Sequence, residues 1–180
     1  SDVAIGTDGA IYVADWFDPV VGGHQMHVSV GYGRIYRIVP KGKELKAPKL
    51  DFKSLEGLIE AFTSPAINVR ANALQLLKAR GEEAIQLTLK LLENENPYYQ
   101  ARAVWLLSLL GEKGKGAAIK LLGHDDAMTR AVAFRALRQT EMDILPFAGQ
   151  LKIDPSSFVR REVAIALKDA AARAATFRSE

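Results

Sequence analysis

The hydrophobic positions of residues 50–180 follow a helical period, and the same pattern returns four times. Apolar residues lie four and eight residues apart in Val69/Ala73/Leu77, Ala101/Trp105/Leu109, Ala133/Leu137 and Val159/Val163/Leu167. Such spacing places them on one face of a helix. An arginine accompanies each copy at Arg70, Arg102, Arg130 and Arg160, with intervals of 32, 28 and 30 residues (102−70, 130−102, 160−130). This self-similarity predicts a helical solenoid of about four helix pairs.

Turn residues separate the expected helices. Ser64, Asn96 and Asp154 each precede a proline, and their side chains are good helix caps. The third copy has no proline, but Asp125 or Asp126 could cap its helix. The Pro–Val–Arg–Ala pattern of these inner helices resembles HEAT repeats over about residues 52–170.

The first forty-four residues have a different pattern. Asp2–Ile5, Ala10–Asp15 and Arg34–Val39 are predicted strands, and a turn at Gly6–Gly9 joins the first two. We therefore expect a mainly α protein with two parts. Residues 1–44 would form a small antiparallel β-meander with open edges, and residues 50–180 the solenoid.

A long connection, residues 16–33, joins the second and third expected strands. It shows neither helical nor alternating periodicity and contains aromatic, aspartate, glycine and histidine residues. Connections longer than about 12–15 residues without structure are usually functional or disordered. The aromatic residues Trp16 and Phe17 argue against plain disorder.

Several motifs in the first part resemble a known family. They are Gly6–Trp16 (GTDGAIYVADW), Asp18-Pro19, Gly22-Gly23-His24 and Gly33–Ile38 (GRIYRI), followed by Pro40-Lys41-Gly42. Together they look like the closing blade of the β-propeller in the large membrane-bound dehydrogenase-like proteins of planctomycetes and verrucomicrobia. That propeller is similar to the soluble quinoprotein sugar dehydrogenases, and HEAT-like repeats follow it. The resemblance implies an extracytoplasmic or periplasmic location.

The candidate site residues lie at the end of the second expected strand and in the long connection. Asp15, Asp18 and His24 are predicted to contact a cofactor or substrate, and His27 to bind a metal. The alternative is that the aspartates cap turns while His24 packs the loop against a neighbouring blade. The resemblance implies a quinone or calcium in the intact protein, and no cofactor held by this chain alone.

The four arginines allow two interpretations. They could form a row that binds anions or acidic peptides, which makes Arg70, Arg102, Arg130 and Arg160 candidate interaction residues. Alternatively, each could pair with an acid or carbonyl of a turn and hold neighbouring repeats in register. The second interpretation explains why the arginine recurs with the period of the fold.

Composition narrows the functions. Of 180 residues, 24 are Lys or Arg and 21 Asp or Glu, giving a net charge of +3 with the two signs mixed along the chain. A nucleic-acid partner is therefore not expected. The chain has no cysteine, which excludes disulfides, thiolate zinc sites and c-type haem attachment within these residues. No apolar stretch approaches the roughly 18 residues of a membrane span.

Two functions remain. One is a scaffold that docks other domains of its parent chain or a partner protein. The other is a part of an oxidoreductase acting on sugars or alcohols with a quinone, in which the loop lines the active site. The sequence leaves open whether the parent protein is an enzyme.

Overall fold

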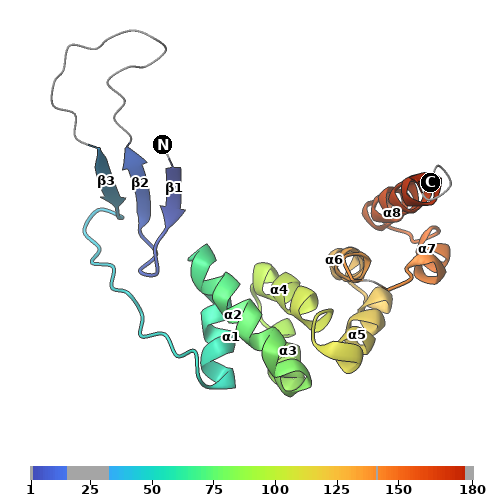
Figure 1. The fold of residues 1–180 in the computed structure, drawn as a ribbon, viewed down its shortest axis with the longest axis horizontal. Helices are drawn as coiled ribbons and strands as arrows, with labels where there is room; N and C mark the ends of the chain where they lie inside the picture. The colour runs from blue at the N-terminus through green and yellow to red at the C-terminus, as the bar shows by residue number, and fades with distance from the viewer. Residues whose placement is uncertain (1, 16–32, 141, 177–180) are drawn as a thin grey trace, which may run out of the picture. The chain divides into compact units, whose positions relative to one another are not determined.

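The structure is a computed structural model that describes residues 2–15, 33–140 and 142–176 (Figure 1). Its strands are β1 (Asp2–Ile5), β2 (Ile11–Asp15) and β3 (Arg34–Ile38). The helices are α1 (Leu55–Thr63), α2 (Ile67–Arg80), α3 (Ile85–Leu92), α4 (Pro97–Leu107), α5 (Gly111–Lys120), α6 (Ala127–Arg138), α7 (Leu145–Leu151) and α8 (Ser157–Thr176), with short 3₁₀ turns η2 (Gly81–Ala84) and η3 (Leu121–Gly123). The expected mainly α fold with a small antiparallel sheet is confirmed.

The chain divides into two compact units, Ser1–Leu74 and Gln75–Glu180. The first holds the sheet, α1 and the start of α2, and the second holds the remaining helices. The expected boundary between residues 44 and 50 stays a prediction.

The sheet is an antiparallel meander in the order β1-β2-β3. Gly9 has φ +80°, a conformation that glycine adopts without strain, and the N–H of Gly6 donates to the carbonyl of Ala10 at 2.9 Å. In the register, Val13 lies between Val3 and Tyr36, and Ile11 lies between Ile5 and Ile38. Because side chains alternate across a strand, these six residues share one face. We call Val3, Ile5, Ile11, Val13, Tyr36 and Ile38 the apolar sheet face.

The helix starts show why the turn residues recur. The Asn96 side chain accepts a hydrogen bond from the N–H of Tyr98 at 3.0 Å, and Pro97 is the first residue of α4, as predicted. In the third copy it is Asp126 that caps, accepting from the N–H of Thr129 at 2.7 Å. Ser64 and Asp154 also accept from the N–H two residues on. However, α2 and α8 start three residues after them, so the two side chains stabilise the turn ahead of the helix.

The core of the second unit lies between consecutive helices, and α4 packs with α3, α5 and α6. Ala133 and Leu137 of α6 are fully buried, as their helical spacing predicts. On α4, however, the predicted stripe is only half-buried. The fully buried residues are its neighbours Ala103, Val104, Leu106, Leu107 and Leu110. A helix packed on several sides buries more than one stripe, so the stripe alone does not identify the core of α4.

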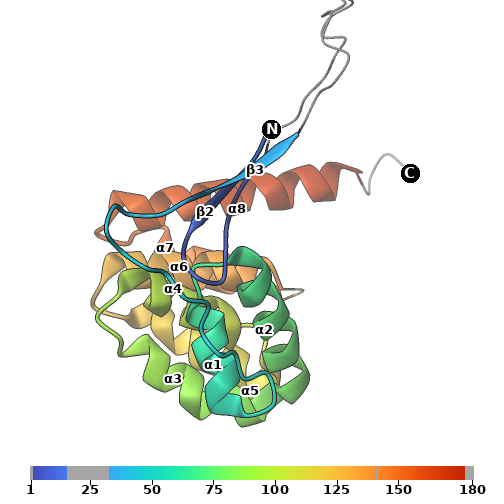
Figure 2. The same cartoon turned by 90° about the vertical axis from the view of Figure 1, so that its left-hand side faces the viewer.

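One residue of the stripe predicted for the last helix is exposed. Val159 and Val163 of α8 are buried, but Leu167 is exposed. Helix α8 is 20 residues long and α6 only 12, so α8 is about 12 Å longer at 1.5 Å per residue (Figure 2). Length does not explain the exposure of Leu167, because Ala166 beside it is buried. The buried face of α8 runs through Val159, Glu162, Val163 and Ala166, and Leu167 lies beside that face.

Candidate interaction surface

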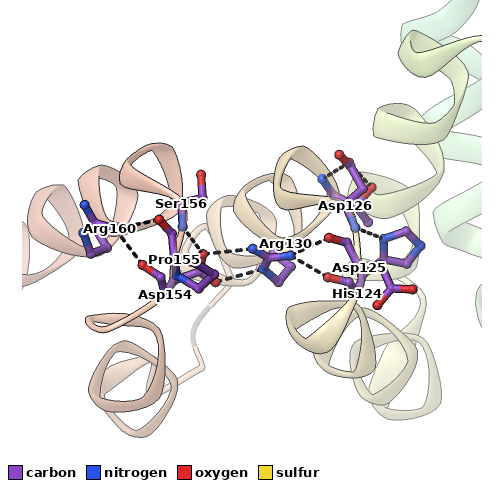
Figure 3. Close-up of polar contacts among 9 residues, drawn as sticks. His124, Asp125, Asp126, Arg130, Asp154, Pro155, Ser156 and Arg160 are labelled. Atoms are coloured by element: carbon purple, nitrogen blue, oxygen red, sulfur yellow. Dashed lines mark hydrogen bonds and ion pairs between the residues drawn. The ribbon is translucent and has the colours of Figure 1, made fainter.

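Arg130 joins two turns of the second unit (Figure 3). Its Nη1 donates to the carbonyls of His124 and Asp125 at 2.7 and 2.8 Å. Its Nε and Nη2 donate to the two carboxylate oxygens of Asp154 at 2.8 and 2.9 Å. The Asp154 side chain is 5% exposed, and its hydrogen bonds from Arg130 lower the pKa of its carboxyl group. One guanidinium thus links the turn before α6 to the turn before α8.

Arg70 and Arg160 bond the turn of their own repeat in the same way. Nη1 of Arg70 donates to the carbonyls of Ser64 and Pro65 at 2.8 and 2.6 Å. Nη1 of Arg160 donates to those of Asp154 and Pro155 at 2.7 and 3.0 Å (Figure 3). In all three cases the partners are the residues six and five positions earlier. The arginine therefore closes the turn of its own repeat, and Arg130 also bonds an acid of the next one.

Arg102 lies against an aromatic ring. Its guanidinium carbon lies 5.3 Å from the centre of the Tyr99 ring, a cation–π distance. In the turn before α4, Nε2 of Gln100 also donates to the carbonyl of Asn94 at 2.7 Å. These contacts favour the structural interpretation of the arginine row, and binding of an outside partner by the arginines stays a prediction.

A second ion pair, which the sequence reasoning missed, links α6 to α8. Arg135 Nε and Nη2 donate to the Glu162 carboxylate at 3.1 and 2.6 Å, and Glu162 is 2% exposed. Bidentate geometry is the strongest arrangement for an arginine and a carboxylate. The pair lowers the pKa of Glu162 and raises that of Arg135. A signal existed, since Glu162 interrupts the apolar stripe around Val159 and Val163.

The loop site predicted from the sequence is described only at its first residue. Asp15 ends β2, is exposed and pairs in register with Arg34 of β3. Asp18, His24 and His27 lie outside the described residues. Within the described ranges no group of three His, Cys, Asp or Glu side chains could hold a metal ion. The cofactor and metal assignments therefore stay predictions.

The sheet carries one polar network that the sequence did not reveal. Arg37 Nε and Nη2 donate to the Asp8 carboxylate at 3.0 and 2.7 Å, and Arg37 Nη2 also donates to the Leu45 carbonyl at 3.0 Å. The Tyr12 hydroxyl donates to Asp8 at 3.2 Å. The N–H of Ala10 donates to the same carboxyl group, and these bonds lower the pKa of Asp8. The network fastens the β1–β2 turn to β3 and the segment after it.

Two hollows open on the second unit. One, of about 270 Å³, lies beside Arg138, Met142 and Ile144. Two Arg138 nitrogens, Nε and Nη1, are buried and have no hydrogen-bond partner among the described residues. The other, of about 240 Å³, lies between α4 and α6 and is lined largely by apolar side chains. We call it the α4–α6 cleft.

The comparisons with known proteins agree with the helical part. Residues 55–138 match the model of HEAT repeats. The HEAT match covers α1 to α6, and α7 and α8 beyond it form a fourth helix pair that carries the same arginine turn at Arg160. No curated protein matches the chain. None of the described helices is long and apolar enough to cross a membrane.

Proposed function

We propose that this chain is a non-catalytic scaffold segment that docks other domains of a larger dehydrogenase-like propeller protein, or a partner protein. The HEAT-like repeats support the interaction role, because stacked helix pairs offer extended binding surfaces. The propeller part of the proposal rests on the sequence motifs of residues 6–42 together with the form of the sheet.

The observation that carries the proposal is the apolar sheet face. Ile38, Val3, Ile5 and Ile11 are 53, 62, 44 and 42% exposed, and Tyr36 is 44% exposed. A contiguous exposed patch of this kind marks an interaction site, and a sheet with three strands needs a further layer for stability. In a propeller, adjacent blades pack face to face and supply that layer. Propeller blades have four strands, so the proposal also requires a fourth strand from the parent chain.

Photo-crosslinking of the full-length gene product in cells tests the docking role. A photoreactive residue replaces Ile11 on the apolar sheet face or Tyr98 on α4, and Ile153, an exposed residue in the turn before Asp154, serves as the control. We expect crosslinks from the first two positions to another domain of the same polypeptide or to a second protein. Crosslinks from neither position would contradict the scaffold function.

The alternative, a part of an oxidoreductase with a quinone, makes a different prediction for the isolated chain. Calorimetric titration with a quinone and with calcium should give no binding heat if the chain is a scaffold. The triple variant Asp15→Ala, Asp18→Ala, His24→Ala is the control. Binding to the natural chain that the triple variant loses would favour the oxidoreductase over the scaffold.

A further inference from the structure

The α4–α6 cleft is a preformed hollow on a rigid support. Its apolar lining comes from Pro97, Ala101 and Val104 on α4 and from Met128 and Val132 on α6. The two helices pack directly against each other, and both start at a capped residue. A site on capped, packed helices needs little ordering when a ligand binds, which favours affinity.

Two large apolar side chains are strongly exposed here: Met128, which lines the cleft, and Tyr98, which follows the lining residue Pro97 in the sequence. Tyr98 is 74% and Met128 55% exposed. Tyrosine is enriched among residues that dominate binding energy at interfaces, and methionine adapts its shape to different partners. The rim and lining together fit one bulky apolar side chain of a partner.

The charges around the cleft indicate which partner residues would flank that apolar side chain. Asp126 is the one charged residue among the described lining residues, and Thr129 holds its carboxylate through the N–H and the hydroxyl at 2.7 and 2.9 Å. These bonds lower its pKa, so it is ionised at neutral pH. Glu95 and Asp125, one residue before each cap, are also exposed.

The positive charge near the cleft is smaller than the negative charge of these carboxylates. The N-termini of α4 and α6 contribute about half a charge each, together about one against three carboxylates. Arg130 is engaged with two carbonyls and with the carboxylate of Asp154. Arg102 does not line the cleft, and its guanidinium lies over Tyr99. The rim is therefore net acidic.

We infer that the α4–α6 cleft binds a short protein segment that carries a bulky aliphatic side chain beside lysine or arginine. The inference rests on the proposed scaffold function and names the partner chemistry of one surface. The aliphatic side chain enters between Val104 and Val132, and the basic groups face Asp126 and its neighbours. Both parts are needed, since apolar burial supplies affinity and charge complementarity supplies orientation and rate of association.

A binding titration on the full chain tests this. The probe is a short end-blocked peptide with one leucine between two lysines in a glycine–serine background, followed by amide chemical shifts. We expect the largest shifts at the starts of α4 and α6. The double variant Tyr98→Ala, Met128→Ala should bind about tenfold or more weakly, because such anchor residues often carry this much of the binding energy.

Two matched variants separate the contributions. Asp125→Asn with Asp126→Asn removes two charges and keeps a side-chain oxygen that can cap α6, and it should weaken binding of the lysine peptide. Ile153→Ala, at a residue 80% exposed in the turn before Asp154, should leave binding unchanged.

The inference is overturned if the peptide does not bind, if the cleft variants bind equally well, or if a glutamate-flanked peptide binds as tightly. None of these results would touch the scaffold function, which fails only if crosslinking finds no partner at either position.

Discussion

Replacing Arg135 with methionine should lower the free energy of unfolding by about 2–3 kcal/mol, because it leaves the carboxylate of Glu162 buried without its bidentate partner. Removing one member of a fully buried pair costs about 3–5 kcal/mol. We expect less here because the Arg135 side chain is 38% exposed, so solvent already screens the pair. Arg138 and Arg161 also lower the pKa of Glu162 through their charge and remain in the variant.

Thermal unfolding followed by helical circular dichroism measures this loss. Lys168→Met, which also replaces a positive charge with methionine at an exposed position of α8, is the control and should cost under about 0.5 kcal/mol. The double variant Arg135→Met, Glu162→Leu removes the buried charge as well and should recover most of the loss. If Arg135→Met unfolds at the same temperature as Lys168→Met, the ion pair does not stabilise the fold.

The pH dependence of this loss has a definite sign. The folded state lowers the pKa of Glu162, so the carboxylate contributes stability that is present above its unfolded pKa of about 4.3. That contribution is lost as the pH falls through the pKa of Glu162 in the folded state. The stability difference between the natural chain and Arg135→Met should therefore be full near neutral pH and shrink below about pH 4. A difference that is constant down to pH 3 would contradict this account.

The parts of the fold that the sequence predicts are those set by local chemistry. Asn96 and Pro97 start α4 where expected, because a side-chain cap and a proline at the first helical position act within one turn. The strands of the meander follow from alternation and from the glycine-rich turn at Gly6–Gly9. The repeated arginines of the turns were visible from their period alone.

The parts that it does not predict depend on partners distant in the sequence. The Arg135–Glu162 pair joins residues 27 apart, and Arg37 reaches Asp8 across 29. Leu109 was expected on the α4 stripe, but the helix ends at Leu107. The N–H of Leu109 donates to the carbonyl of Leu106, three residues earlier, in a tighter turn. Periodicity names one face of a helix, whereas tertiary packing decides which faces are covered. Of the loop site, only Asp15 can be placed.

Gly114 of α5 is expected to be intolerant of any side chain. A methyl group there would lie 2.7 Å from Cβ of Leu110 and against the backbone carbonyl of Leu107, and backbone cannot move aside as a flexible side chain can. Gly114→Ala should therefore destabilise the chain by about 2–3 kcal/mol or more, at the upper end of overpacking costs. Alanine is otherwise the better helix former, so propensity works against this loss and cannot explain it.

Gly116, two residues later in the same helix, provides the matched control. A Cβ there meets nothing within 4 Å, so Gly116→Ala should stabilise the chain by about 0.5–1 kcal/mol through helix propensity alone. The two variants make the same chemical change in one helix and should shift the midpoint of urea unfolding in opposite directions. If both raise it, α5 does not approach the end of α4 as closely as the structure has it. If only Gly116→Ala raises the midpoint, the close approach at Leu107 is what requires a glycine at position 114.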